Sequence, residues 1–234
     1  ASCHTAVHDW APLTDDDAKD GWAPWQGLAP SALDQLPRRF TPKAMDAGDI
    51  KIVLDAWREA TRRSMDAGYD ILEIHGAHGY LIHQFLSPVS NHRNDAYGGD
   101  RAGRMRFALE VAEVVRDAWP RDKPLFFRVS SVDGEGGMWN LDDTVALSKE
   151  LKDRDIDLVD CSSGGISGDS EMPMIPRIEQ FQAGFAERVR READIRTIAV
   201  GGITEASQAE GILQSGRADL VALAREFLWN ADWA

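Results

Sequence analysis

The chain has 234 residues, with 39 acidic and 26 basic side chains, so its formal net charge at pH 7 is −13. This length suits one large domain or two small ones with a sizeable hydrophobic core. The acidic balance argues against nucleic acid and against an anionic membrane surface as partners, because both attract a basic footprint. No apolar run approaches the roughly 20 residues that span a bilayer, and no cleavable signal is visible. Two cysteines are too few for a disulfide framework and suit a reducing, cytoplasmic location.

The first 47 residues differ in composition from the rest of the chain. They contain five prolines, three tryptophans and an acidic run at 15–17, and no helical or strand period persists in them. A long excursion of this kind is usually functional or disordered, and its aromatic content favours an ordered flap over a disordered linker. We therefore expect a long loop or flap over residues 1–47, followed by one domain over residues 48–234.

Helix and strand patterns alternate from residue 49 onward. Apolar residues at helical spacing, with a glycine at the end of the first segment, predict helices at about 49–67, 101–118, 147–154, 179–192 and 206–216. Short apolar runs predict strands at 70–75, 124–130, 157–161, 196–200 and 219–223. Near-continuous apolar strands that alternate with amphipathic helices indicate an α/β protein with a parallel sheet covered by helices.

Two α/β architectures fit this alternation, a doubly wound sheet and a (β/α)8 barrel. A barrel typically takes about 250 residues and has eight strands, whereas this sequence predicts five, so the barrel requires that about three units are missing. In both architectures ligands bind at the carboxyl ends of the strands. The residues that follow each predicted strand are therefore the candidates for chemistry.

A pair of histidines, His75 and His78, lies at the end of the first predicted strand. Two neutral imidazoles at such a position can hydrogen-bond a carbonyl oxygen and stabilise negative charge that develops on it. A zinc site is the rival interpretation, but zinc needs a third ligand, for which His83, His92 or Glu73 is near in sequence. The bare H-x-x-H spacing by itself favours a third interpretation, in which one of the two histidines is a structural core or surface residue.

Two further polar side chains lie near strand ends. Tyr80 offers a phenol that is protonated at neutral pH and can donate a proton, although most single tyrosines simply pack. Arg128 interrupts an otherwise apolar strand, and a buried arginine needs an anion or a polarised acceptor. An internal ion pair with Glu73 or Asp160 explains Arg128 equally well.

The last two predicted strands carry features of a phosphate site. Gly201 and Gly202 follow the fourth strand and precede a helix start, where free backbone N–H groups can bind a phosphate. Arg225, just beyond the last strand, adds a charged donor. In barrels the loops after strands seven and eight usually form the phosphate site. Turn geometry and a solvated helix start explain these features singly, but their combination favours a phosphate-containing cofactor.

A longer motif makes the sequence similar to a known family. The run Glu73–Pro88, E-I-H-G-A-H-G-Y-L-I-H-Q-F-L-S-P, and the run Asn91–Gly99, N-H-R-N-D-A-Y-G-G, closely resemble the Old Yellow Enzyme family of FMN-dependent flavoproteins. The His-x-x-His form resembles its bacterial, thermophilic-like branch. The resemblance extends over about residues 29–233 and implies a (β/α)8 TIM barrel whose fourth strand ends at His75. Only about the last five β/α units would then be present, with residues 48–234 forming the C-terminal part of the flavin-binding barrel.

The resemblance implies an NAD(P)H-dependent oxidoreductase, an ene-reductase. NADPH or NADH would reduce FMN, and an α,β-unsaturated carbonyl or nitro compound would then accept hydride from flavin N5 at its β-carbon. His75 and His78 match the pair that hydrogen-bonds the activating oxygen of the substrate, and Tyr80 matches the donor of the α-proton. No metal takes part in this chemistry.

The resemblance also implies the residues that bind the cofactor. Arg128 matches the arginine that faces the N1/O2 edge of the flavin. The residues that match the FMN phosphate site are Gly201, Gly202, Ala224 and Arg225. The partners would be small molecules rather than nucleic acid or membrane. Assembly into a homo-oligomer is compatible with the resemblance.

Two other functions are weighed against this one. The first is a metal-dependent TIM-barrel lyase or hydrolase with His75 and His78 as ligands, for which stoichiometric zinc without flavin absorbance would be the evidence. The second is an inactive flavin-binding fragment, which would show itself if these 234 residues bound no FMN whereas a longer chain did.

Overall fold

The architecture is built on a five-stranded parallel sheet. The computed structural model describes residues 7–8, 11–12, 19, 26–33, 41–134, 138–166 and 177–233. The strands of the sheet are β5 (Leu72–Gly76), β6 (Leu125–Ser130), β7 (Leu158–Ser162), β8 (Arg196–Val200) and β9 (Leu220–Ala222). They lie side by side in chain order, and each neighbouring pair is parallel. The five strands predicted from the sequence are confirmed, and their consecutive order is that of a barrel.

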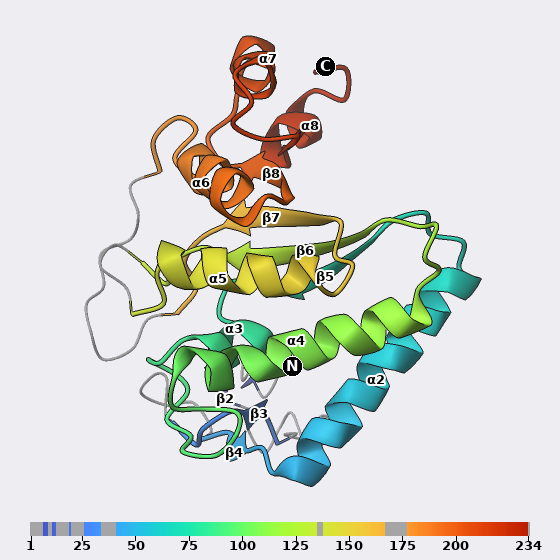
Figure 1. Cartoon of the computed structure of the whole chain (residues 1–234), viewed down its shortest axis with the longest axis vertical. Helices are drawn as coiled ribbons and strands as arrows, with labels where there is room; N and C mark the ends of the chain where they lie inside the picture. Colours follow the sequence, from blue (N-terminus) through green and yellow to red (C-terminus); the bar gives the residue numbers. More distant parts are fainter. Residues whose placement is uncertain are drawn as a thin grey trace.

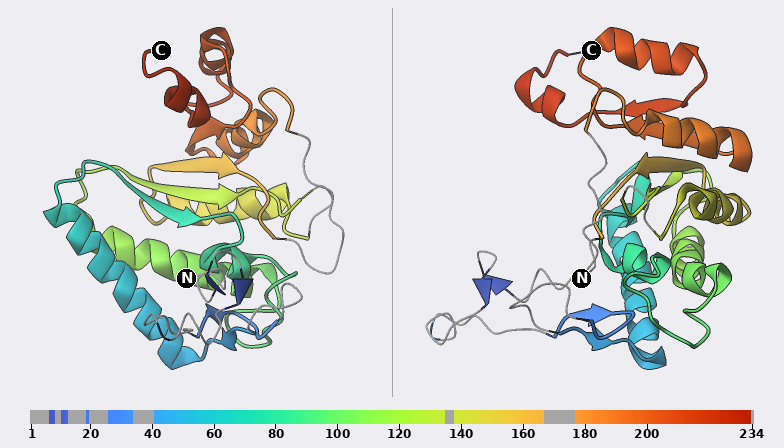
Figure 2. Two further views of the ribbon diagram at one scale, coloured as in Figure 1. Left: turned by 180° about the vertical axis from the view of Figure 1, so that it is seen from behind. Right: turned by 90° about the vertical axis from the view of Figure 1, so that its left-hand side faces the viewer.

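Helices connect the strands, and the longer ones cover one face of the sheet. They are α2 (Ala47–Asp66), α3 (Leu81–Leu86), α4 (Arg101–Ala118), α5 (Leu141–Lys152), α6 (Ala183–Ala193), α7 (Ala206–Gln214) and α8 (Arg225–Trp229). Figures 1 and 2 show α2, α4, α5 and α6 gathered on one side of the sheet. In the part of the chain that the structure describes, no helix is both long and apolar enough to cross a membrane.

The helix boundaries follow from local capping. The N-cap of α4 is Asp100, which accepts a hydrogen bond from the Gly103 N–H, and the helix covers the predicted residues. Helix α5 begins before its predicted start at 147, because Asn140 and Asp143 form a capping box. Helix α6 begins after its predicted start at 179, because residues 179–182 form turns.

The hydrophobic core lies between the sheet and its helices, as the alternation along β6 shows. Leu125, Phe127 and Val129 are fully buried beneath the helices. The side chains of Phe126 and Arg128, at the alternating positions, are only partly buried and belong to the opposite face of the sheet. That opposite face is where a barrel has its interior.

Part of the first 47 residues is attached to this core. A parallel pair is formed by β3 (Leu28–Ala29) and β4 (Lys43–Ala44), and β1 (Val7–His8) pairs with β2 (Ala11–Pro12) in an antiparallel manner. The Arg93 guanidinium donates hydrogen bonds to backbone carbonyls next to β3 and β4. The tryptophans and the acidic run on which the ordered flap was predicted lie outside the described residues.

Candidate active site

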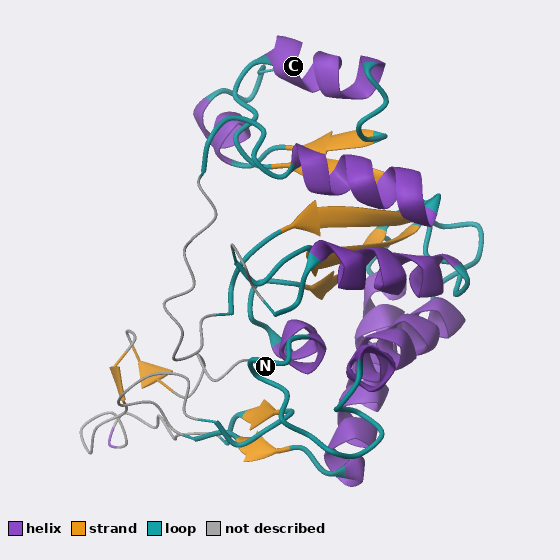
Figure 3. Cartoon of the chain, turned by 60° about the vertical axis from the view of Figure 1, so that its left-hand side comes forward, coloured by secondary structure: helices purple, strands orange, loops and turns teal. Residues whose placement is uncertain are grey.

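The candidate residues meet at the carboxyl edge of the sheet. The strand arrows point towards one edge, and the loops that leave this edge follow them in sequence (Figures 1 and 3). His75 on β5 is in register with Arg128 on β6, which is in register with Asp160 on β7. The three side chains therefore form a row across the sheet on the face away from the helices.

Three rings converge at the end of β5. The ring centroids of His75 and His78 are 5.1 Å apart, and those of His75 and Tyr80 are 5.4 Å apart. The chain between them does not turn as a right-handed helix. His78 and Gly79 both adopt left-handed backbone conformations, with φ of 57° and 75°. The structure thus brings the predicted histidine pair and tyrosine together, through a turn that the sequence spacing did not indicate.

Two serines hold His78 in this arrangement. The His78 N–H donates to Oγ of Ser130 at 2.9 Å, and His78 Nε2 lies 2.6 Å from Oγ of Ser162. The Ser130 hydroxyl donates in turn to the Gly164 carbonyl at 2.7 Å. Neither serine was predicted as a site residue. Ser130 and Ser162 are the last residues of β6 and β7. The sequence could have indicated them by this position, because polar side chains at the carboxyl ends of barrel strands are candidate active-site residues.

Both histidines are neutral at pH 7. Burial, with the positive charge of Arg128 and the neighbouring histidines, lowers the pKa of His78 to about 4. Burial and the same Arg128 charge also lower the pKa of His75. Neutral imidazoles can donate hydrogen bonds to an oxygen of a ligand without carrying a charge of their own.

The interior face next to the histidines carries one arginine between carboxyl groups. Arg128 Nε lies 3.2 Å from Oδ2 of the buried Asp160. Burial raises the pKa of Asp160 to about 6, against the opposing effect of Arg128. Desolvation of the carboxyl and the Asp160 charge raise the pKa of Glu73 to about 7, although Glu73 as a whole residue is exposed. Of the two partners considered for an ion pair with Arg128, the structure shows Asp160.

This ion pair leaves hydrogen-bonding capacity unused. Arg128 Nε meets Asp160 as an ion pair without hydrogen-bond geometry, and within the described residues the buried Asp160 Oδ1 has no hydrogen-bond partner. Buried polar groups without partners are uncommon and call for an explanation. The Arg128 side chain retains 28% of its surface exposed. Its guanidinium therefore fits a bound group with anionic character at the carboxyl edge of the sheet.

The predicted phosphate residues leave the same edge from neighbouring strands. Strands β8 and β9 are in register at Val200 and Ala222, so the segments that follow them start side by side. Gly201 has a φ of 98°, and a Cβ there would lie 2.7 Å from the Gln182 amide nitrogen. The helix start that follows is confirmed, since Glu205 forms a capping box at α7.

The other residues of the predicted phosphate site lie at the start of α8. Ala224 is its N-cap residue, and Arg225 is its exposed first residue. Gly202, in the turn after β8, also has a positive φ, and a Cβ there would lie 2.4 Å from the Ile178 carbonyl oxygen. The glycines thus keep this turn free of side chains.

A cavity of about 380 Å³ adjoins the ring cluster. His75 and Tyr80 form one wall, with the first two residues of α3. The other wall is the face of α2 that carries Val53, Ala56, Trp57 and Ala60. The cavity is largely apolar and lies between α2 and the end of β5, and neither Arg128 nor Asp160 lines it.

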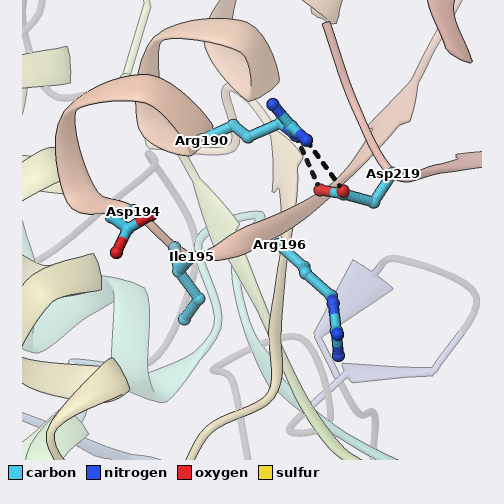
Figure 4. A pocket seen from close by; sticks show the side chains of 5 residues that line it. All are labelled: Arg190, Asp194, Ile195, Arg196 and Asp219. Carbon is cyan, nitrogen blue, oxygen red and sulfur yellow. Dashed lines mark hydrogen bonds and ion pairs between the residues drawn. The ribbon is translucent and has the colours of Figure 1, made fainter. Parts of the chain in front are cut away.

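A second depression lies at the opposite edge of the sheet (Figure 4). Arg196 is the first residue of β8, and Asp219 precedes β9, so this depression is at the amino ends of the strands. Arg190 forms two hydrogen bonds with the Asp219 carboxylate, at 3.0 and 3.2 Å. The Asp219 carboxylate also accepts the Thr197 N–H, which makes it part of the sheet's own structure.

The zinc interpretation finds no support in the geometry. In the described ranges, no group of three or more His, Cys, Asp and Glu side chains is arranged to hold a metal ion. His83, one of the expected third ligands, is fully buried and forms a hydrogen bond with Asp133 instead.

The consecutive parallel strands, with a polar site at their carboxyl edge, define the chain as part of a (β/α)8-barrel protein. The chain belongs to the NADH:flavin oxidoreductase / NADH oxidase family, whose model matches residues 14–234. This confirms the resemblance to Old Yellow Enzyme on which the fold was predicted.

Individual relatives agree with this assignment. The chain is 47% identical over 207 residues to an NADPH dehydrogenase of Geobacillus sp. (strain WCH70), which covers 88% of this chain and 59% of the relative. It is 44% identical over 201 residues to an NADPH dehydrogenase of Bacillus subtilis (strain 168), and this match covers 86% of this chain and 58% of that relative. The structure of the old yellow enzyme homologue from Zymomonas mobilis superimposes with a TM-score of 0.72 at 27% identity, covering 89% of this chain and 59% of that one. The chain therefore spans about three fifths of the length of the relatives it matches.

Proposed function

We propose that the intact protein is an FMN-dependent oxidoreductase that uses NADPH or NADH to reduce activated C=C bonds in α,β-unsaturated carbonyl or nitro compounds. The observation that carries this proposal is the convergence of His75, His78 and Tyr80 beside Arg128, in a chain of the flavin oxidoreductase family. The names of the curated relatives favour NADPH as the reductant.

His75 and His78 bind and polarise the substrate. Their lowered pKa values keep both imidazoles neutral at physiological pH. Hydrogen bonds from two such rings to a carbonyl or nitro oxygen strengthen as negative charge develops on that oxygen during reduction. The Ser162 hydroxyl, 2.6 Å from His78 Nε2, fixes the orientation of that ring before the substrate arrives.

Tyr80 donates the proton that completes the reduction. Its ring meets that of His75 edge-on, with the ring centroids 5.4 Å apart. A substrate whose oxygen is bound by the two histidines therefore has its α-carbon near the phenol. General acid catalysis of this kind requires a donor within hydrogen-bond reach of the carbon that takes the proton.

The cofactor site would lie on the interior face of the sheet. Bound FMN, reduced by NAD(P)H, supplies the hydride. The Arg128 guanidinium, whose side chain is 28% exposed, has capacity for an electron-rich edge of the flavin ring beyond its ion pair with Asp160. The turn at Gly201 and Gly202 and the N-terminal residues of α8, Ala224 and Arg225, would bind the phosphate through backbone N–H groups and one guanidinium.

The test is a visible absorption spectrum of the purified intact protein, followed by anaerobic titration. We expect flavin absorbance that NADPH bleaches and that 2-cyclohexenone restores. Cyclohexanone, which has the same carbonyl but no C=C bond, is the matched control and should restore nothing. Protein without flavin would contradict the cofactor, and bleached flavin that cyclohexenone leaves unchanged would contradict the substrate class.

A further inference from the structure

A buried polar network lies directly behind the candidate site. His83, on α3, is fully buried, and its Nε2 lies 2.8 Å from Oδ1 of Asp133 in the loop after β6. The other oxygen of Asp133 accepts from the Ser87 hydroxyl at 2.7 Å and from the Trp139 N–H at 3.0 Å. Three groups, two from α3 and its C-cap and one from the loop between β6 and α5, thus meet around one buried carboxylate.

The network reaches the active-site turn through His83. The Gly79 N–H donates to Nδ1 of His83 at 3.0 Å. An imidazole nitrogen that accepts a hydrogen bond carries no proton, so a neutral His83 has its proton on Nε2, from which it donates to Asp133. Asp133 therefore selects the one tautomer of His83 that can accept from Gly79.

Gly79 is the middle of the stretch that carries the candidate catalytic groups. It lies between His78 and Tyr80, and both His78 and Gly79 are left-handed. A left-handed conformation is unfavourable for a histidine, so the surroundings must hold it. The Gly79 carbonyl accepts from the Gln84 side chain at 2.7 Å, so α3 binds both polar groups of the Gly79 backbone.

We propose that His83, oriented by Asp133, is a positioning residue that fixes the left-handed turn at His78 and Gly79 and thereby sets where His78 and Tyr80 meet the substrate. His83 touches neither substrate nor cofactor in this scheme. It acts through one hydrogen bond, to the Gly79 N–H. The inference rests on the proposed function for its kinetic consequence only, since the hold on the turn is a property of the fold.

Two nearly isosteric variants isolate this hydrogen bond. His83→Asn places a carbonyl oxygen near the position of Nδ1 and keeps an acceptor for Gly79, whereas His83→Leu has similar bulk and no acceptor. The first readout is hydrogen exchange of the Gly79 amide in the intact protein. We expect exchange in His83→Leu to be about tenfold faster than in the wild type, as loss of one buried hydrogen bond predicts, and exchange in His83→Asn to stay within about threefold.

The second readout is turnover of 2-cyclohexenone by protein with full FMN content. A small misplacement of reacting groups costs up to about a hundredfold in rate, so we expect kcat of His83→Leu to fall about tenfold to a hundredfold, with His83→Asn restoring most of it. Val115→Ala, a cavity variant in the buried face of α4, is the control for lost stability. It should lower the melting temperature without changing kcat or the exchange of Gly79.

The outcomes separate this inference from the proposed function. Equal Gly79 exchange in His83→Leu and the wild type would overturn the positioning role, whatever the activity. Equal kcat in His83→Leu and Val115→Ala would overturn its catalytic consequence. A wild-type protein that reduces no enone would overturn the proposed function, and the exchange of Gly79 would still decide whether His83 holds the turn.

Discussion

At the scale of single residues, the candidate site combines one phenol with two neutral imidazoles. Tyr80 is 44% exposed, whereas His75 and His78 are partly buried among positive and neutral neighbours. The histidines can therefore bind an oxygen at neutral pH without a change of protonation, and the tyrosine can exchange its proton with solvent. In the proposed function, oxygen binding by the histidines and proton donation by Tyr80 therefore use different protons.

Tyr80→Phe tests the proton donor. The variant removes one hydroxyl and leaves the ring beside His75, so we expect the cyclohexenone step to slow by about a hundredfold or more, the range of general acid catalysis. Stopped-flow absorbance of flavin reoxidation measures this step. Tyr97→Phe is the matched control, because that hydroxyl is bound to Glu110 instead, at 3.0 Å. An unchanged rate in Tyr80→Phe would assign the proton to another donor.

His78→Asn tests the neutral state of the histidine through stability. The folded protein binds a proton at His78 only near pH 4, whereas the unfolded chain does so near pH 6.5. Between these values the unfolded state holds more protons, so the contribution of His78 to stability falls as the pH drops from 6.5 to 4. Asparagine does not titrate and tolerates the left-handed conformation.

The measurement is urea unfolding of both proteins at several pH values. The free energy of unfolding of the wild type minus that of His78→Asn should decrease as the pH falls through this window. Glu73 and Asp160, whose raised pKa values act in the opposite direction, are present in both proteins and cancel in the difference. A difference independent of pH would show that the pKa of His78 is not lowered.

At the scale of elements, two loops cross at close range behind the ring cluster. A Cβ on Gly165, which follows β7, would lie 2.2 Å from the His78 carbonyl carbon, and a Cβ on Gly79 would lie 2.1 Å from the Gly165 carbonyl oxygen. Both glycines have positive φ. The end of β5 and the end of β7 can approach this closely only because neither position has a side chain.

Gly165→Ala tests this crossing. Gly68 is the matched control, because it also has a positive φ but has open space where a Cβ would go. Gly68→Ala should lower the free energy of unfolding by about 1–2 kcal/mol, the cost of the left-handed conformation. Gly165→Ala should lower it by a further 1–3 kcal/mol, roughly the cost of overpacking. Equal losses in urea unfolding would mean that the two loops separate easily.

The sequence predicted the elements better than the turns between them. Periodicity located α4 and all five strands, because alternation and helical spacing record which side chains are buried. It gave no sign of the left-handed turn at His78, which depends on Ser130 and His83, or of the choice of Asp160 over Glu73 as partner of Arg128. These contacts join residues far apart in sequence, and a single chain carries no record of such pairs.

At the scale of the whole chain, the five described strands form a sheet with two end strands and three inner strands. Among the described strands β6, β7 and β8 have a neighbour on each side, whereas β5 and β9 have a neighbour on one side only. All five residues of β7 are buried, whereas β9 has three residues and none is buried. The local free energy of opening should differ accordingly.

Hydrogen exchange of the 234-residue chain tests this gradient. We expect the amides of β7 to be the slowest to exchange and those of β9 to be among the fastest in the sheet, because an edge strand opens without disturbing the core. Peptide-level mass spectrometry resolves the two strands. If β9 exchanged as slowly as β7, another segment or a second copy of the chain would have to cover its edge.

The family resemblance supplied what periodicity could not at this scale. Five predicted strands were compatible with a doubly wound sheet or a barrel. Only the long motif around His75 favoured the barrel, because it resembles a family that has this fold. The strand order agrees with that choice, because a doubly wound sheet reverses its order at a switch point and β5 to β9 do not. The roles of the site residues remain predictions, which the variants above address.

The crossing of the loops at Gly79 and Gly165 bears on how such a chain can change over evolutionary time. A residue inserted or deleted within 76–80 or 163–165 would shift one backbone past the other and separate the two glycines. Length variation among homologous chains should therefore avoid these two short stretches, and diversity in which molecules they accept should arise from exchanged side chains rather than from altered loop length.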